Sequence, residues 1–211
     1  MRALVLLSGG LDSAVALWWA QRAGHDIVPL TYRYKGRPVR EARAARDLAD
    51  RAGLHLIEAD LPFLAEPADA PLVHERSRVA RDAPRGYIPA RNAIFYATAA
   101  YYAELLACDI IVGGHHAEDA ARFPDATPSF FERFERIVQD GLWSPDEGPP
   151  HGPSLVMPLI ALTKLEVVAL GRELGVPMAL AWSCYEDGEA PCGACPSCTE
   201  RHGVAAEALA L

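Results

Sequence analysis

The sequence lacks any long hydrophobic run. No stretch approaches the ~20 consecutive apolar residues that a helix needs to cross a lipid bilayer. The opening residues MRALVLLSGG are too short an apolar run for a secretion signal, because polar residues follow at once. We therefore expect a cytoplasmic protein that makes no membrane contact.

The chain also lacks an excess of basic residues. It has 20 Lys and Arg against 28 Asp and Glu, which gives a net charge of -8. Proteins that hold nucleic acid by its phosphates usually carry a positive balance. The acidic balance therefore favours a small-molecule ligand and no nucleic acid. With 211 residues, 51% of them hydrophobic, the chain is long enough for one substantial domain.

Two common nucleotide-binding patterns, GxxxxGK[ST] and GxGxxG, are absent. Instead, residues 5–15 read VLLSGGLDSAV, in which an apolar run ends in Ser-Gly-Gly and a helix-like segment follows. A strand that leads through glycines into a helix gathers backbone N–H groups and the positive end of the helix dipole. The hydroxyls of Ser8 and Ser13 add donors, so we expect a phosphate-binding loop. Asp12 fits an indirect magnesium-holding role or a helix N-cap, and a simple capped turn is the alternative to a binding loop.

Strand-like and helix-like segments alternate along the chain. Strands are expected at 3–7, 26–34, 54–61, 108–114 and 157–162, and helices at 13–23, 39–53, 93–107 and 163–175. Strands separated by helical segments imply an open parallel sheet with helices on both faces. Two stretches without a clear period, 62–87 and 144–153, are expected to form a long loop or lid and a linker.

Cysteine is scarce except near the C-terminus, where four of the five lie. These four are Cys184, Cys192, Cys195 and Cys198. The C-x7-C-x2-C-x2-C spacing predicts a closed tetrahedral zinc site with a structural role, because four thiolates leave no open position for substrate. The alternatives are free thiols, an iron–sulfur cluster, or His202 as fourth ligand in place of Cys184. Cys108 is expected to be a small buried hydrophobic residue.

Polar residues in the middle of the chain are candidate ligand contacts. Arg91 and Asn92 begin a helix, where an arginine opposes the dipole, and this favours an anion facing Arg91. Asp119 lies in GGHHAEDAARFPD after the fourth expected strand, at the edge where parallel sheets bind ligands. Phe123 is a candidate for stacking and Lys164 for neutralising phosphate. A solvated loop explains the His and acidic residues of 115–119 as well as a metal does.

Four motifs in order carry a family resemblance. SGGLDS resembles the pyrophosphate loop of the N-type ATP pyrophosphatases, which cleave ATP between the α- and β-phosphates. Together with IPARN, PLIALTK and SCY…CGACPSC, it resembles the 7-cyano-7-deazaguanine synthase family of the queuosine pathway. The resemblance implies an adenine nucleotide α-hydrolase-like, Rossmann-like domain over residues 1–180. It also implies a zinc-binding segment over 181–211 that packs on this domain.

The resemblance implies a ligase. The carboxylate of 7-carboxy-7-deazaguanine is adenylated by ATP and converted by ammonia to the amide, and a second ATP leads to the nitrile with release of AMP and pyrophosphate. ATP, magnesium, zinc and a homodimer are implied as well. The implied catalytic residues are Asp12, Ser13 and Lys164. The implied ATP-binding residues are Leu7, Ser8, Gly9, Gly10, Leu11, Asp12 and Ser13. The implied substrate-binding residues are Tyr34, Arg37, Arg91, Asn92, Asp119, Phe123 and Asp125. The four C-terminal cysteines are the implied zinc ligands.

The sequence departs from the family pattern in two places. The family's Tyr-Gly-Gln-Arg-His is replaced within YKGRPVRE (34–41), and its Asp-x-x-Gly-Tyr-Pro-Asp-Cys-Arg becomes DAARFPDAT (119–127). These departures leave open the same chemistry on another acid, a reaction that stops at the amide, or conjugation of a deazaguanine to another amine. A tRNA-thiolating enzyme of the same superfamily and a nucleotide-binding module without turnover are further alternatives.

Overall fold

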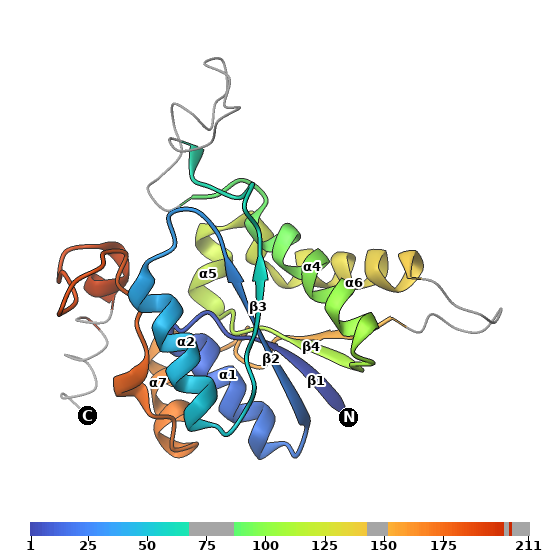
Figure 1. The fold of residues 1–211 in the computed structure, drawn as a ribbon, viewed down its shortest axis with the longest axis horizontal. Helices are drawn as coiled ribbons and strands as arrows, with labels where there is room; N and C mark the ends of the chain where they lie inside the picture. The colour runs from blue at the N-terminus through green and yellow to red at the C-terminus, as the bar shows by residue number, and fades with distance from the viewer. Residues whose placement is uncertain (68–86, 143–151, 201–202, 204–211) are drawn as a thin grey trace.

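Five parallel strands form the centre of the fold in the described residues. They are β1 (Arg2–Leu6), β2 (Asp26–Arg33), β3 (Ile57–Asp60), β4 (Ile110–Val112) and β5 (Ser154–Val156). Their order in the sheet is β3-β2-β1-β4-β5, and every neighbouring pair is parallel (Figure 1). The computed structural model describes residues 1–67, 87–142, 152–200 and 203.

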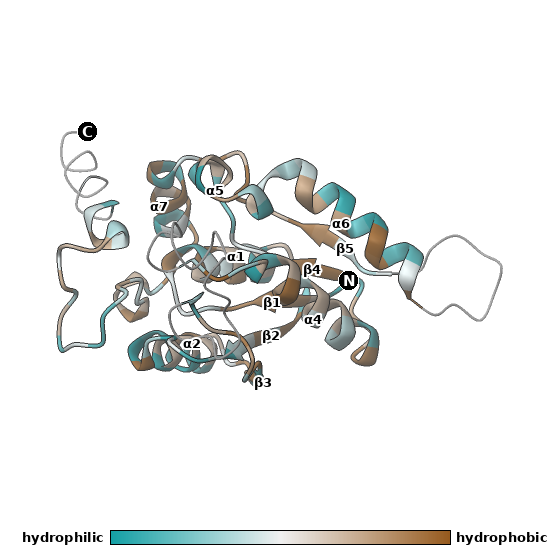
Figure 2. Ribbon diagram, turned by 90° about the horizontal axis from the view of Figure 1, so that it is seen from above, coloured by the Kyte–Doolittle hydropathy of each residue, from teal (hydrophilic) through white to brown (hydrophobic). Residues whose placement is uncertain are grey.

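Helices cover both faces of this sheet. One face packs against α1 (Leu11–Arg22), α2 (Val39–Arg51) and α7 (Lys164–Glu173), and the other against α4 (Arg91–Leu105) and α6 (Pro128–Gly141). Shorter helices are α5 (Ala117–Arg122), η2 (Pro124–Ala126) and η3 (Met178–Leu180). Figure 2 shows these layers from above, with hydrophobic strands between helices that carry hydrophilic residues. No helix in the described part of the chain is long and apolar enough to span a membrane.

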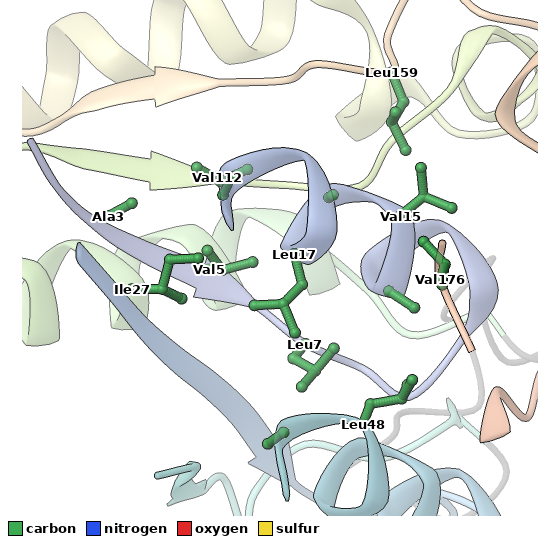
Figure 3. Packing of buried hydrophobic residues seen from close by; sticks show 14 of the residues in the cluster. Ala3, Val5, Leu7, Val15, Leu17, Ile27, Leu48, Val112, Leu159 and Val176 are labelled. Carbon is green, nitrogen blue, oxygen red and sulfur yellow. The ribbon is translucent and has the colours of Figure 1, made fainter. Parts of the chain in front are cut away.

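The two faces follow from the alternation of side chains along the strands. Ala3 and Val5 of β1 belong to the core beneath α1, whereas Leu4 belongs to the core beneath α4. This is the period of two that a β-strand imposes. Figure 3 shows Val5, Leu17 and Val112, all fully buried, in the α1-side core. Burying one such side chain contributes about 1.5–3 kcal/mol to folding.

The predicted α/β alternation and the parallel sheet with helices on both faces are confirmed. The strand expected at 157–162 is wrong, because the fifth strand lies just before it, at Ser154–Val156, and pairs with β4. Residues 158–161 form turns in which Leu159 is fully buried, so their apolar character reflects the core and not a strand.

Helix α6 was not predicted from the sequence. Thr127 caps it by accepting a hydrogen bond from the Phe130 N–H at 3.2 Å, and Pro128 occupies its first position. Within the expected loop at 62–87, the described residues 62–67 and 87 lie in no strand or α-helix. Residues 68–86 of that loop, and 144–151 of the expected linker, lie outside the described residues.

Candidate functional site

A pocket opens where the strand order reverses, between β1 and β4. The chain leaves β1 for its neighbour on one side, β2, and later returns to the other side as β4. Ligands of open parallel sheets bind beyond the carboxyl ends of the strands at such a point. A pocket of about 270 Å³ lies here, lined by the loop after β1, the loop after β4 and the start of α4.

The loop between β1 and α1 has the form expected of a phosphate-binding loop. The Ser8 N–H donates to the Ser13 hydroxyl at 3.2 Å, and that hydroxyl donates to the Gly10 carbonyl at 2.9 Å. These bonds tie the two ends of the loop together at the N-terminus of α1. Gly10 is the N-cap residue and Asp12 lies in the first turn, so the N-cap interpretation of Asp12 is wrong.

Two glycines allow the loop to pack closely against its neighbours. Gly9 has a φ of +100°, and a Cβ there would lie 2.2 Å from the carbonyl oxygen of Glu41 in α2. A Cβ on Gly114, in the loop after β4, would lie 2.8 Å from the backbone of Asp12. Helix α2 and the β4 loop therefore fix the path of the phosphate loop from two sides.

Asp12 and Lys164 form a short ion pair beside the loop. The Lys164 ammonium lies 2.7 Å from each carboxylate oxygen of Asp12. Lys164 begins α7, whose N-cap Thr163 forms a capping box with Glu166. Burial lowers the pKa of Lys164, but the charge and hydrogen bonds of Asp12 outweigh it and leave the pKa above its usual value. Lys164 is therefore a fixed positive charge at the phosphate loop.

His116 and Glu118 complete this cluster, although the local pattern indicated a solvated loop for them as much as a metal site. The His116 ring is buried, with Nδ1 2.6 Å from Glu118 Oε2. Its Nε2 lies 4.0 Å from Asp12 Oδ2 and 3.7 Å from Asp119 Oδ2. Glu118 also accepts the backbone N–H of Lys164 at 3.0 Å. The buried His116 side chain does not fit the solvated-loop interpretation, and its place in the loop between the buried strand β4 and α5 was the available signal.

Most of the predicted substrate residues are gathered around the same pocket. The lining includes Tyr34, Arg37, Arg91, Asn92, Asp119 and Phe123. It also includes Leu7, Ser8, Gly10, Asp12 and Ser13 of the predicted ATP-binding residues. Gly9, Leu11, Lys164 and Asp125 are not part of the described lining. The Asp125 carboxylate instead accepts the Asn92 N–H at 3.1 Å, which holds the start of α4 in place.

Arg37 lines the pocket, but its guanidinium is already occupied. It donates to the carbonyl oxygens of Tyr32 and Ser8, and so joins the end of β2 to the phosphate loop. Glu41, which the predicted residue set omitted, also lines the pocket and lies 3.9 Å from Arg37 Nε. Burial raises the pKa of the Glu41 carboxyl, although Arg37 opposes this shift.

Thr31 provides an independent test of whether a ligand fits. Its hydroxyl oxygen is buried and has no hydrogen-bond partner among the described residues, yet the residue lines the pocket. An unpaired buried hydroxyl costs free energy, and such groups are rare unless something else pairs with them. Leu30 and Phe95 supply apolar pocket wall. This end of the pocket fits a ring with polar edges, and the loop end fits phosphate, so the pocket fits a nucleotide.

The four predicted zinc ligands come together at one point. Their sulfur atoms all lie within 4.8 Å of one another. Sulfur atoms around a tetrahedral zinc ion lie roughly 3.8 Å apart, because each Zn–S bond is about 2.3 Å. The N–H groups of Ala194 and Cys195 lower the pKa of the Cys192 thiol to about 6, whereas burial raises the pKa of Cys198 to about 12, so the proximity of the four sulfur atoms, and not their pKa values, supports a metal site. The donor set therefore fits a closed metal site, and His202 lies outside the described residues.

The parallel sheet, its strand order and the loop at the switch point define the fold class of the PP-loop ATP pyrophosphatases. The match to solved structures supports this class. A 4-thiouridine synthetase–RNA complex with bound ATP matches with a TM-score of 0.59 and 17% identity, over 98% of this chain and 50% of that one. The U34-tRNA thiolase NcsA from Methanococcus maripaludis, with its [4Fe-4S] cluster, matches with a TM-score of 0.51 and 14% identity, over 98% and 64%. The chain thus spans half to two thirds of these two proteins, and the likeness concerns the fold alone.

The family is defined by sequence. The model of the family described as queuosine biosynthesis protein QueC matches residues 2–208, so the chain belongs to this family. A relative from Nostoc sp. (strain PCC 7120) is 36% identical over 98% of this chain and 93% of its own length. One from Picrophilus torridus is 37% identical over 95% and 85%. Both relatives are named 7-cyano-7-deazaguanine synthase, so this is an enzyme family.

Proposed function

We propose that this chain is an ATP-dependent ligase that converts 7-carboxy-7-deazaguanine and ammonia into 7-cyano-7-deazaguanine. The observation that carries the proposal is the SGGLDS loop at the switch point, with Lys164 paired to Asp12 beside a pocket that fits a nucleotide. The full-length similarity to relatives of that name supports the choice of substrate.

In the first step, a carboxylate oxygen of the substrate attacks the α-phosphorus of ATP, and pyrophosphate leaves. The backbone amides at the start of α1 and the hydroxyls of Ser8 and Ser13 would hold the leaving pyrophosphate. Lys164 would balance the charge that develops on it. Magnesium supplied with ATP would neutralise phosphate oxygens, and the carboxylates of Asp12 and Asp119 are the oxygen donors available to hold it.

In the later steps, ammonia attacks the adenylated carbonyl carbon, AMP leaves with its bonding electrons, and a proton is lost to give the amide. The amide oxygen then attacks the α-phosphorus of a second ATP and releases pyrophosphate. Loss of AMP and of both N–H protons of the former amide gives the nitrile. Arg91, at the start of α4, would attract the carboxylate or phosphate, and Phe123 would stack on the heterocycle.

The proposal also covers the C-terminal segment and the assembly. Zinc is the metal that a closed set of four thiolates favours, and such a site would hold the segment and not react. From the family resemblance we expect a homodimer in the cytoplasm that takes no nucleic acid substrate. Metal analysis of the purified protein and its mass in solution test these two points.

The decisive experiment mixes the protein with ATP, magnesium, ammonia and 7-carboxy-7-deazaguanine and follows AMP, pyrophosphate and the heterocycle by mass. Nitrile with two AMP per molecule supports the proposal. No AMP with this acid, but AMP with another, would retain the adenylation chemistry and reject the substrate. The absence of AMP with any acid would reject the ligase.

An amide-forming enzyme is the second candidate, and Thr127 is the observation that favours it. Thr127 stands where the family pattern has an arginine, and its side chain caps α6. An arginine there would pair with the substrate carboxylate or with phosphate. Its replacement by threonine therefore affects either the binding of the substrate or the activation of the amide by the second ATP. AMP with amide but no nitrile, in the experiment above, would establish this candidate.

A further inference from the structure

The cysteine-rich segment contacts the phosphate loop directly. The backbone N–H of Trp182 donates to the Gly9 carbonyl at 2.9 Å. The Asp187 carboxylate accepts the N–H groups of Val39 and Arg40, at 3.0 and 2.9 Å, and so caps the start of α2. Because α2 is also the helix against which Gly9 packs, the segment supports the loop both directly and through α2.

Glu200 brings a second carboxylate to Lys164. Two residues after the last cysteine, its carboxylate lies 3.7 Å from the Lys164 ammonium and 3.3 Å from the Arg122 guanidinium. The Glu200 side chain is 18% exposed and that of Lys164 14% exposed, so solvent screens this pair only in part. Lys164 therefore lies between the carboxylate of Asp12 in the loop and that of Glu200 in the segment.

We propose that Glu200 is a positioning residue held in place by the metal-bound segment. Its carboxylate fixes the position of the Lys164 ammonium and allows the Asp12 carboxylate to leave Lys164 for the nucleotide and its cation. This inference rests on the proposed function. The ammonium occupies both oxygens of Asp12, the carboxylate that lines the pocket. A second carboxylate within 4 Å offers the ammonium another partner, so Asp12 can leave Lys164 at a lower cost when ATP and a divalent cation arrive.

The position of Glu200 depends on the cysteines. A short helical turn joins them, in which the Thr199 N–H donates to the Cys195 carbonyl at 2.9 Å. Cys195 and Cys198 are buried against Trp182 and Ala44. A metal ion bound by the four thiolates would cross-link this turn to Cys184 and Cys192, and so would hold Glu200 more firmly than the hydrogen bonds of the turn alone. A closed metal site catalyses no reaction itself. By holding Glu200 in place, it would still affect how the nucleotide site binds ATP and its cation.

The test compares Glu200→Gln with Glu104→Gln, a change at an exposed glutamate on α4. Glu200→Gln should retain its metal, with a Tm within about 2 °C of the parent. The magnesium concentration that half-saturates ATP binding, measured by calorimetry, should rise roughly two- to fivefold, as expected for a partly screened ion pair. Glu200→Asp should restore part of the effect, and Glu104→Gln should show none.

The same substitution is then made in metal-free protein, either Cys198→Ser or chelator-treated parent. The proposal expects Glu200→Gln to have no further effect there, because Glu200 has already lost its position. An equal effect with and without metal, or no effect in the metal-bound protein, would overturn it. Because binding is measured without the acid, failure of the ligase assay alone would count against the proposed function and not against Glu200.

Discussion

The Lys164 ammonium lies 2.7 Å from both carboxylate oxygens of Asp12, and this contact joins residues 152 positions apart in the sequence. One residue belongs to the first turn of α1 and the other begins α7. The contact places a carboxylate and an ammonium together at the mouth of the phosphate loop. The charges of this pair are therefore the first place to test the proposed chemistry.

Asp12→Asn keeps the size of the side chain and removes its charge. We expect pyrophosphate release to fall by about 10²-fold or more, because the carboxylate would act on charge that develops as pyrophosphate leaves. The dissociation constant of ATP should change by less than about fivefold, a difference near 1 kcal/mol. Rapid-quench measurement of pyrophosphate and calorimetry with ATP separate the two effects.

The matched control for this substitution is Asp26→Asn, at the start of β2. Asp26 lies 3.4 Å from Arg2, and the Asp26 side chain is 75% exposed. This change should leave both measurements as they are. Equal losses of ATP binding and turnover in Asp12→Asn would show that Asp12 acts in binding alone, whereas ATP binding without pyrophosphate release in the parent would favour a nucleotide-binding module.

Thr31→Val should have opposite effects on stability and on ATP binding. The Thr31 hydroxyl is buried without a described partner, so replacing it by a methyl group should leave the free energy of unfolding unchanged or raise it by up to about 1 kcal/mol. If a nucleotide pairs with this hydroxyl, ATP should bind about five- to tenfold more weakly. Thr31→Ser retains the hydroxyl and should bind ATP as the parent does. Unchanged binding in Thr31→Val would remove Thr31 from the nucleotide site.

Local sequence predicted the loop and the cysteine cluster, because each is encoded within a short segment. Ser8 and Ser13 lie five residues apart and meet across one turn. Contacts between distant segments could not be predicted, since no local pattern pairs Lys164 with Asp12 or with Glu200. Asp125 shows the same limit. The family resemblance implied a substrate contact for Asp125, and no local pattern indicated that its carboxylate accepts the Asn92 N–H at the start of α4.

One of the fold errors has a related cause. The apolar residues of 157–162 satisfy the composition of a strand, but Leu159 is buried by turns that follow β5. Helix α6 is a different case, because its signals are local: Thr127 caps it, Pro128 occupies its first position, and Phe131 and Val138 lie on one buried face. Burial in the tertiary structure decided the first case, whereas α6 was available from the local pattern.

Cys198→Ser should remove the metal and lower the Tm, whereas Cys108→Ser should retain the metal. Cys198 is one of the four clustered thiols, and Cys108 is a buried thiol in the core beneath α4. We expect metal content to fall from about one per chain to near zero only in Cys198→Ser, because three thiolates leave a position open to water or chelators. Elemental analysis and thermal unfolding check this. If both variants retain the metal content of the parent, the four-cysteine metal site is rejected.

Glu41→Gln should stabilise the protein at neutral pH. Burial raises the pKa of Glu41 above its ordinary value of 4.5, so the folded state holds this proton to higher pH than the unfolded chain does. The contribution of Glu41 to stability is therefore fully present below about pH 4.5 and is lost as the pH rises through the folded pKa. Glutamine carries no charge and escapes this loss. Denaturant unfolding between pH 4 and 8 should show that the free energy of unfolding of the variant increases relative to that of the parent as the pH rises.

Glu58→Gln should show the opposite trend, and the two variants control each other. Two hydrogen bonds from Arg46, at 2.8 and 2.7 Å, lower the pKa of Glu58, while burial opposes them. The stability that Glu58 contributes is present above its unfolded pKa and is lost as the pH falls through the folded value. Glu58→Gln should therefore be less stable than the parent at neutral pH, and the difference should vanish in acid. Profiles with the same trend for Glu41→Gln and Glu58→Gln would contradict one of the two assignments, because burial and ion pairing shift a carboxyl pKa in opposite directions.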